Sequence, residues 1–457
     1  MAEDLTLFQS ARPRPHRREI LQVGFSGFLG LGLHHVVGAT RLAAALSERE
    51  RGRVKSVIFV FLTGAPSHQD MWDLKPEAPV GIRGEFEPID TNVSGVQISE
   101  HLPRLSKLAD KYAIIRSMTH SLPSHEHGTH RMLTGINKEP PGSTHMVSRN
   151  DWPCYASGLQ YLRPRPDGLP SGVMLPTYLN NGYGFCGQNA GFLGGDYDPW
   201  HVTKNPNDKN FRIEELELSP GLTVERLDSR RDLLQSIDAQ RRALEETAIV
   251  RDMSQRMKQA HNVLTGNSRF QEAFDMDREP VEMRDRYGRH LFGQSLLLSR
   301  RLVEAGIPIV QANMGSMNHW DLHTQNFKRL KGERLPPFDQ GMSALITDLD
   351  ERGLLEQTLI VATGEFGRTP QINANAGRDH WSRVFSAVFF GGGISGGQVI
   401  GASDAMASDP ATRGWYPADF GATIYSALGI DVESLVIDRL NRPHQLNAGT
   451  VISPLYA

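Results

Sequence analysis

Residues 57–62, VIFVFL, constrain the fold of this 457-residue chain more than any other segment. All six residues are apolar, and they are mainly β-branched or aromatic, without the polar alternation of a strand that has one exposed face. Such a run predicts a strand buried on both sides, as in a parallel sheet that is covered by helices. The run ends at residues 63–66, TGAP. In α/β enzymes, ligands bind at the loops that follow the carboxyl ends of such strands.

The rest of the chain alternates between strand-like and helix-like patterns. Further strands are predicted at 113–118, 306–310, 358–362 and 384–390, and helices at 103–112, 343–352 and 418–428. This alternation predicts an α/β fold over residues 54–457, with a doubly wound, mostly parallel sheet and helices on both faces. Residues 138–215 are rich in Gly, Pro and Asn and predict a loop-rich insertion. Residues 222–304 have apolar residues at helical spacing and predict a helical insertion.

The first 46 residues have the order of an export signal. Four arginines precede a Gly-rich apolar stretch at 23–37, and three alanines at 43–45 form a candidate cleavage site. The segment 16–21, HRREIL, resembles a twin-arginine signal. We therefore expect a periplasmic or extracellular protein, although an amphipathic N-terminal helix would also fit this pattern. No later stretch is long and apolar enough to span a bilayer, so the mature chain is expected to have no integral membrane span.

Charge and cysteine content narrow the classes of function. The net charge is −3 and no long basic block occurs, so nucleic acid is not an expected partner. The two cysteines, Cys154 and Cys186, are too few for a zinc cluster. They would either pair in an oxidising compartment or remain as two buried thiols.

Histidines gather with acidic residues in four loops that follow predicted strands. The side chains in these loops are His68, Asp70, His125, His127, His130, His319, Asp321, His323, Glu365, Asp379 and His380. Imidazole and carboxylate groups are ligands of Zn²⁺, Mn²⁺ and iron. A metal stabilises the negative charge that develops when a phosphate or sulfate ester is attacked. The sequence therefore predicts a site for a divalent metal; the alternative is that these histidines cap a helix and bind nearby loops.

Several of these segments closely resemble a bacterial family called domain of unknown function 1501, which is placed in the alkaline phosphatase/sulfatase superfamily. The segments are GAPSHQDMWDLKPEAP, ISEHLPRLSKLADKYAIIRSMTH, HEHGTHRMLTG, LSRRLVEAGIPIVQ, NHWDLHTQNF, TLIVATGEFGRTP and GRDHW. The resemblance covers the chain from about residue 57 to its C-terminus. It implies an alkaline phosphatase/sulfatase-like fold and an exported, metal-dependent hydrolase of phosphate or sulfate esters. The substrate would be a small anionic ester or a sulfated or phosphorylated glycan.

The resemblance also implies one or two metal ions, with Zn or Mn favoured over Ca or Fe. Asp321 and His323 resemble the acid–histidine pair of one metal, and His380 resembles the later histidine of the same metal. His319 is a competing ligand, and Asp379 lies directly before His380.

The ligands of a second metal match the superfamily pattern less well. Glu365 would take the place of an acidic ligand, but Phe366 stands where a histidine is usual. The acid expected after the first strand is missing, so Asp70 or His68 would have to supply it from farther along the loop.

The nucleophile is the position at which the chain departs most from the superfamily. Residues 132–135, MLTG, resemble the end of the sulfatase nucleophile helix, and His125 stands where a Cys, Ser or Thr is usual. Thr129 and Ser124 are the nearest hydroxyls; alternatively, a water activated by the metal attacks directly. His125 and His127 would then be ligands or general acids, and Arg131 would bind an anionic oxygen of the substrate.

Two rival functions follow from the same departures. One is an exported binding or structural protein that keeps the fold without hydrolysis, which the residues Phe366 and His125 favour. The other is a phosphotransferase or mutase of the same superfamily, which would require a hydroxyl residue that accepts the phosphoryl group.

Overall fold

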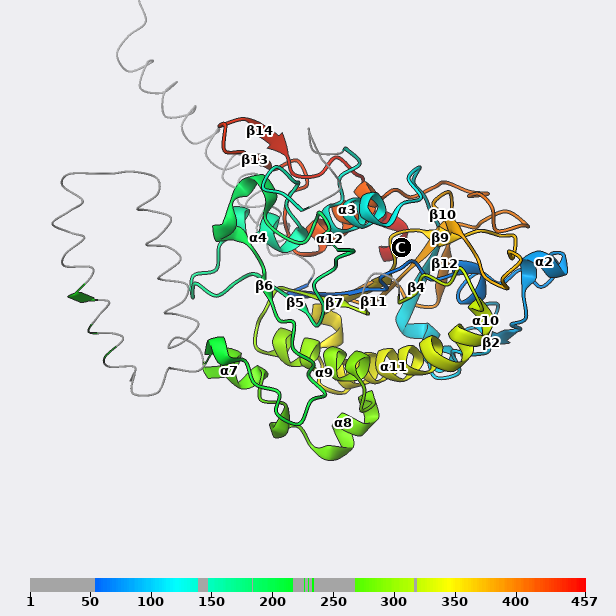
Figure 1. Ribbon diagram of the computed structural model, residues 1–457, viewed down its shortest axis with the longest axis horizontal. Helices are drawn as coiled ribbons and strands as arrows, with labels where there is room; N and C mark the ends of the chain where they lie inside the picture. The colour runs from blue at the N-terminus through cyan, green and yellow to red at the C-terminus, as the bar shows by residue number, and fades with distance from the viewer. Residues whose placement is uncertain are drawn as a thin grey trace, which may run out of the picture. The chain divides into compact units, whose positions relative to one another are not determined.

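A computed structural model describes residues 54–138, 147–182, 184–216, 226, 229, 232–233, 268–315 and 319–457. An eight-stranded sheet runs through this part of the chain in the order β12-β4-β11-β8-β1-β7-β5-β6 (Figure 1). Its strands are β1 (Ser56–Phe61), β4 (Tyr112–Met118), β5 (Gly172–Leu175), β6 (Trp200–His201), β7 (Ile309–Asn313), β8 (Thr358–Thr363), β11 (Phe385–Gly391) and β12 (Gln398–Ile400). Strand β11 is antiparallel to β4 and β8, and the other neighbouring pairs are parallel. The predicted mostly parallel sheet is confirmed.

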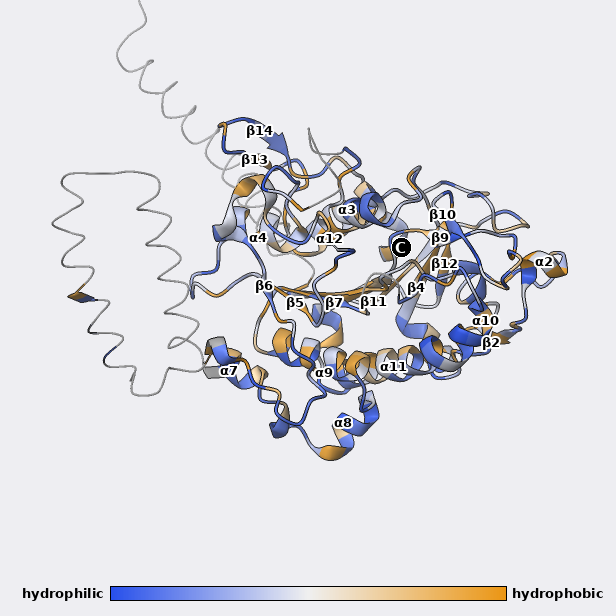
Figure 2. Cartoon of the chain, viewed as in Figure 1, coloured by the Kyte–Doolittle hydropathy of each residue, from blue (hydrophilic) through white to orange (hydrophobic). Residues whose placement is uncertain are grey.

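Strand β1 lies inside the sheet, between β7 and β8, and all six of its residues are buried. Its side chains alternate between two cores: Ile58 and Val60 belong to one, and Val57 and Phe59 to the other. Helices α9 (Leu291–Glu304) and α11 (Leu335–Glu351) cover the first face. Helices α3 (His125–Thr134), α4 (Tyr155–Leu162) and α12 (Pro417–Ala427) cover the second (Figure 1). Hydrophobic residues accordingly concentrate on the strands and on the two long helices α9 and α11 (Figure 2), as a doubly wound sheet requires.

The remaining elements are short. The other helices described are α2 (Val80–Arg83), α7 (Ser268–Ala273), α8 (Val281–Tyr287) and α10 (Asn326–Arg329), together with the π-helical turn η7 (Leu330–Arg334). The 3-10 helices are η1 (His68–Asp70), η2 (Leu105–Lys111), η3 (Gly191–Leu193), η4 (Gly195–Tyr197), η5 (Glu214–Leu216), η6 (Met276–Arg278), η8 (Leu355–Gln357) and η9 (Ser453–Tyr456). Three two-stranded sheets pair β2 (Pro88–Asp90) with β3 (Gln97–Ser99), β9 (Gly367–Arg368) with β10 (His380–Trp381), and β13 (Leu435–Ile437) with β14 (Pro443–Gln445).

The structure differs from the sequence-based expectation in three places. The helix expected at 103–112 is the 3-10 segment η2, because the backbone leaves helical geometry at Leu108. Helix α11 begins earlier than expected, at Leu335. The loop-rich segment 138–215 contributes α4 and two strands of the sheet, β5 and β6. The predicted export signal, 1–46, lies outside the described residues, as does about half of the predicted helical segment 222–304; residues 268–304 of that segment contain α7, α8 and α9.

Two further findings concern the membrane and the cysteines. In the part of the chain that the structure describes, no helix is long and apolar enough to cross a membrane.

Cys154 and Cys186 are both buried and no disulfide joins them. Burial raises the pKa of the Cys154 thiol to about 11. The described structure therefore has buried thiols, the second of the two arrangements expected from the sequence.

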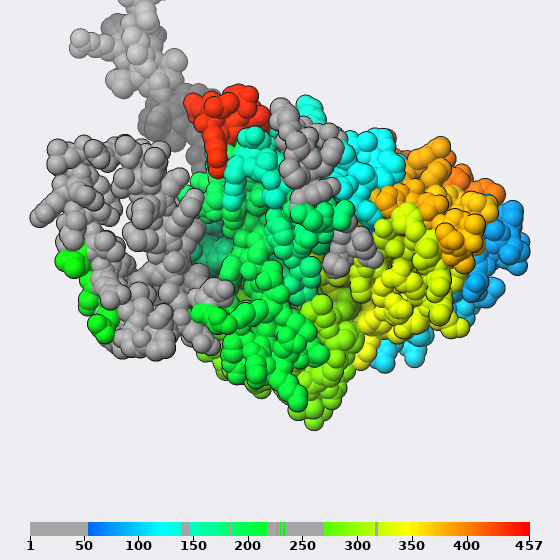
Figure 3. Space-filling view, viewed as in Figure 1, coloured from blue at the N-terminus to red at the C-terminus, as the bar shows by residue number. Residues whose placement is uncertain are grey.

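The loops that follow β1, β4, β7 and β8 leave the sheet at its carboxyl edge, because these four strands run in the same direction. Strand β11 runs the opposite way, so the segment that precedes it, which contains β10, meets the same edge. In the space-filling view, the early residues in blue lie beside the late residues in orange (Figure 3). The topology thus gathers the four predicted histidine loops at one edge of the sheet.

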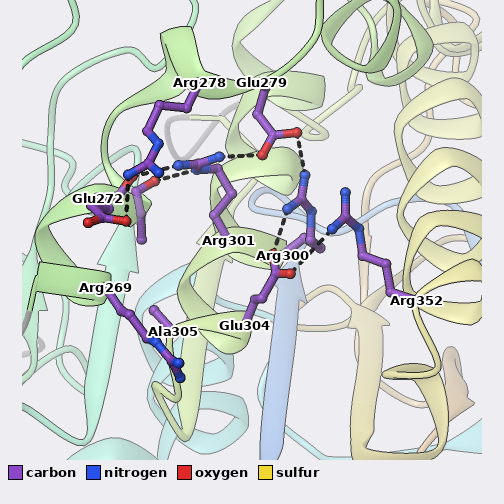
Figure 4. Close-up of a pocket in the computed structure, with 10 residues that line it drawn as sticks. Arg269, Glu272, Arg278, Glu279, Arg300, Arg301, Glu304, Ala305 and Arg352 are labelled. Carbon is purple, nitrogen blue, oxygen red and sulfur yellow. Dashed lines mark hydrogen bonds and ion pairs between the residues drawn. The ribbon is translucent and has the colours of Figure 1, made fainter.

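Elsewhere in the molecule, a pocket at α7, η6 and α9 is lined by a network of ion pairs (Figure 4). The buried Arg300 lies 2.7 Å from a carboxylate oxygen of Glu279, 2.7 Å from one of Glu304 and 2.9 Å from one of Asp348. Its neighbour Arg301 also contacts Glu279. The network joins the end of η6 to α9 and α11, so we assign it a structural role.

Replacement of Arg300 with Met should lower the free energy of unfolding by about 2–3 kcal/mol, because two buried carboxylates lose a partner while keeping others. Urea unfolding monitored by circular dichroism measures this loss. Arg212→Met, which removes an exposed pair with Asp277, is the control and should have little effect. An equally small loss for Arg300→Met would contradict the structural role.

Candidate metal centre

Asp321 lies at the centre of the predicted site, and both of its carboxylate oxygens are in contact with basic side chains. Its Oδ1 is 3.1 Å from His323 Nε2, 3.3 Å from His380 Nε2 and 2.5 Å from Arg368 Nη2. Its Oδ2 is 3.3 Å from His125 Nε2. Burial alone would raise the pKa of Asp321, but hydrogen bonds from His125 and His380 and the charge of Arg368 outweigh burial and hold the pKa well below its ordinary value. Asp321 is therefore an ionised carboxylate.

Each of the two histidines at Oδ1 is oriented through its other ring nitrogen. His323 Nδ1 lies 2.7 Å from Asp379 Oδ1, and His380 Nδ1 lies 3.0 Å from the carbonyl oxygen of Pro123. A carboxylate and a carbonyl only accept hydrogen bonds, so both Nδ1 atoms are the donors. In the form that binds a metal, each ring would keep its proton on Nδ1 and offer the lone pair of Nε2 to the ion.

The two lone-pair nitrogens and the carboxylate oxygen converge on one point. The Nε2 atoms of His323 and His380 are 3.0 Å apart, and each lies within 3.3 Å of Asp321 Oδ1. An ion about 2.0–2.2 Å from three such atoms would set them roughly 3.0–3.5 Å apart. The spacing and the chemistry of these three atoms therefore fit a divalent transition metal. His125 lies close by: ligand atoms of His125, Asp321 and His380 are all within 4.8 Å of one another.

His125 is the first residue of α3, and its ring lies between two carboxylates. Its Nδ1 is 2.5 Å from Glu365 Oε1, and its Nε2 faces Asp321. The two oxygens of Glu365 also accept hydrogen bonds from the backbone N–H of Gly64, at 3.0 and 3.2 Å. Burial alone would lower the pKa of His125, but the hydrogen bonds to Asp321 and Glu365 raise it to about 9. Glu365 thus orients His125 and connects it to the loop after β1.

Arg368, in β9, directs its guanidinium toward backbone oxygens as well as toward Asp321. Its Nε donates to Ala65 O at 2.8 Å, its Nη1 to Arg378 O at 3.3 Å, and its Nη2 also to Gly64 O. The side chain is 1% exposed, so its donors are used inside the protein. Arg368 fixes the loops after β1 and β8 relative to Asp321.

Four further predicted ligands lie elsewhere or have another role. Asp70 forms a fully buried, bidentate ion pair with Arg378, with both N–O distances 2.8 Å. The buried His68 lies beside Ala407 O at 3.3 Å, and burial lowers its pKa to about 4. His319 lies beside Arg334, and burial followed by this positive charge lowers its pKa to about 4. Asp379 does lie at the centre, where it accepts the hydrogen bond of His323.

The remaining predicted catalytic residues lie along α3. His127 Nδ1 is 2.5 Å from the hydroxyl of Ser124, the residue that caps the helix. Thr129 is buried, with 0% of its surface exposed. Arg131, farther along the helix, is half-buried, and its charge adds to burial in lowering the pKa of His130 to about 4. The structure brings together His125, Asp321, His323, Glu365, Asp379 and His380, and it places the side chains of His68, Asp70 and His319 in other contacts.

Sequence reasoning missed the groups that orient the ligands. The carbonyl of Pro123 holds His380, and the backbone N–H of Gly64 holds Glu365. Asn373 donates to Asp379 at 3.1 Å and to the carbonyl of His323 at 3.0 Å. A contact made by a backbone group cannot be predicted from the type of the residue that carries it. Asn373 lies outside the histidine motifs, so its role was not predicted either.

Comparison with solved structures finds matches at low similarity. The crystal structure of Ps i-CgsB in complex with k-i-k-neocarrahexaose has 12% identity and a TM-score of 0.40, and the match covers 88% of this chain and 76% of that one. A magnesium-bound mutant of TAB5 alkaline phosphatase has 12% identity and a TM-score of 0.36, covering 83% and 99%. A protein in the alkaline phosphatase superfamily from Vibrio parahaemolyticus has 11% identity and a TM-score of 0.37, covering 84% and 68%.

No curated protein matches the sequence. A family model described as "Protein of unknown function (DUF1501)" matches residues 54–456, which is nearly the whole described chain. The chain belongs to this family.

Proposed function

We propose that this protein is a metal-dependent hydrolase of phosphate or sulfate esters, with Asp321, His323 and His380 as ligands of a divalent ion. The observation that carries the proposal is the convergence of two imidazole nitrogens and one carboxylate oxygen within 3.3 Å of one another. A bound cation would be shared by all three atoms once the imidazole nitrogens release their protons. Zn²⁺ and Mn²⁺ suit a set of two imidazoles and one carboxylate.

The position of α3 supports an anionic substrate. His125 is the first residue of this helix, so the helix N-terminus lies at the centre. The N-terminus of a helix carries a partial positive charge, and its unpaired N–H groups favour anions. On the open side of the centre, the side chains of His323 and Asp379 are 42% and 53% exposed. A small ester therefore has access to the ligands from solvent.

The chemistry would be divided between the ion and the protein. A bound ion would stabilise the negative charge that develops on the ester oxygens. Asp379 and the carbonyl of Pro123 hold the two histidines with Nε2 toward Asp321. Arg368 and Glu365 fix Asp321 and His125, so the site needs little rearrangement during reaction.

Metal removal tests the proposal directly. The purified chain should contain Zn, Mn, Fe or Ca by elemental analysis, and it should hydrolyse at least one member of a panel of aryl phosphates, phosphodiesters and aryl sulfates. Treatment with a chelator should reduce turnover to the background rate, and restoration of the metal should recover it. Turnover that survives complete metal removal would overturn the proposed mechanism.

A binding protein without turnover is the second candidate, and the burial of Thr129 favours it. A hydroxyl that is 0% exposed does not reach a substrate in this conformation, which also counts against a phosphotransferase that uses Thr129. The same panel separates these functions. A metal-loaded protein that binds inorganic phosphate or sulfate but hydrolyses no ester would support the binding protein.

A further inference from the structure

The inner side of the centre, which faces β1 and α3, differs from the open side. There, both oxygens of Glu365 are directed toward protein donors. Oε1 is in contact with His125 Nδ1 at 2.5 Å and with Gly64 N at 3.0 Å, and Oε2 lies 3.2 Å from Gly64 N. Glu365 is fully buried. An ion that bound Glu365 would therefore have to displace partners that the chain itself supplies.

The His125 ring fills the gap between the two carboxylates of the centre. Its two nitrogens lie 2.5 Å from Glu365 Oε1 and 3.3 Å from Asp321 Oδ2. Any ion shared by Asp321 and Glu365 would have to occupy the space that this ring takes. The ring is also held in place, because its residue begins α3 directly after the Ser124 cap.

Phe366 and α3 close the remaining space around this ring. The Phe366 ring centroid is 5.1 Å from that of His125 and 4.9 Å from that of His380, and it offers no ligand atom. Helix α3 packs on the same residues at Gly128, where a Cβ atom would lie 3.0 Å from Phe366 Cδ1 and 3.1 Å from Glu365 Cβ. This packing brings the backbone of α3 directly against Glu365 and Phe366.

Arg368 supplies a permanent positive charge at the same place. Arginine stays protonated inside proteins, and Arg368 Nη2 lies 2.5 Å from Asp321 Oδ1. Its other donors bind carbonyl oxygens from the loops after β1 and before β10, so the guanidinium cannot swing away without breaking these bonds. The charge of Asp321 is thus already partly balanced at Oδ1.

From these contacts we infer that the centre takes a single divalent cation, and that the His125 ring occupies the place that a second ion would need while Arg368 already balances part of the charge of Asp321. This inference rests on the proposed metal site and deepens it. Glu365 is then a positioning residue that holds His125, and it is not a metal ligand. The single ion is bound on the open side by Asp321, His323 and His380.

The test is a count of Mn²⁺ ions per chain. The metal-free full-length protein is loaded with excess Mn²⁺, freed of unbound ions by gel filtration, and examined by elemental analysis and electron paramagnetic resonance. We expect one ion per chain and the spectrum of an isolated Mn²⁺. Two ions per chain, with the coupled spectrum of ions about 3.5–4 Å apart, would overturn the single-ion inference and leave the proposed function intact. No bound ion would overturn both.

Two matched variants identify the ligands by the same count. Glu365→Gln keeps the size of the side chain and should still bind one Mn²⁺, although its turnover should fall because His125 loses a charged partner. His323→Gln should reduce Mn²⁺ content well below one. If Glu365→Gln loses an ion while its circular dichroism spectrum stays unchanged, Glu365 is a ligand and the inference is wrong.

Discussion

The Asp321→Asn variant is expected to lose metal and turnover together, with the metal affinity falling by at least about 100-fold. The substitution keeps the shape of the side chain but removes the negative charge that three basic groups share at Oδ1. Loss of a residue that only orients a ligand typically costs 10–100-fold in metal affinity, so loss of the ligand itself should cost more. Competition with a fluorescent chelator measures the affinity, and the ester panel measures turnover.

Variants of two other aspartates provide the comparison for the Asp321→Asn result. Asp379→Asn should reduce the affinity by about 10–100-fold, because Asp379 holds the Nδ1 of His323 and does not face the converging atoms. Asp277→Asn, which removes an exposed carboxylate near α8, should change neither affinity nor turnover. If Asp321→Asn kept the metal content and turnover of the wild type, the centre would not be where we place it.

The largest loss of stability is expected for Arg378→Met, at about 3–5 kcal/mol of unfolding free energy. Arg378 and Asp70 form a bidentate pair in which both side chains are 0% exposed. Asp70 keeps its contacts with Ser67 at 2.6 Å and Asn326 at 2.8 Å. Removal of the arginine nevertheless leaves a buried carboxylate without its counter-charge.

A surface pair of the same geometry provides the control for this prediction. Arg286 also binds a carboxylate through two bonds, to Glu351 at 2.7 and 2.9 Å, but these side chains are 32% and 56% exposed. Arg286→Met should therefore cost less than about 1 kcal/mol. Urea unfolding of both variants compares the two sites directly. Equal losses would show that burial does not set the contribution of the Asp70–Arg378 pair.

The sequence predicted the strands that are continuously apolar, and it predicted the histidine loops that the structure brings together after them. Residues 57–62 and 358–362 predicted two central strands. The motif around Asp321 and His323 predicted the candidate metal centre. Strand β5 was not predicted from the sequence because glycines and prolines flank its four residues. Its place in the sheet comes from pairing with β7, far along the chain.

The sequence could not distinguish a ligand from a buried counter-ion. Asp70 stands beside a histidine and resembles a ligand, yet its partner Arg378 is 308 positions away. Similarly, the sequence does not show that the donors of Arg368 bind carbonyl groups, which every residue type carries. Long-range pairing and backbone contacts decide these roles, and neither leaves a pattern in the local sequence.

The way the loops meet at the carboxyl edge also has a consequence for the order of folding. His125 and Glu365 are 240 positions apart, and they meet only when β4, β8 and β11 have assembled. An ion that needs Asp321 and His380 together therefore has little to bind in a partly folded chain. Contacts that form after the folding barrier slow unfolding without accelerating folding. A bound ion would thus extend the lifetime of the native state, and proteolysis that depends on unfolding would become slower in the loaded protein than in the metal-free one.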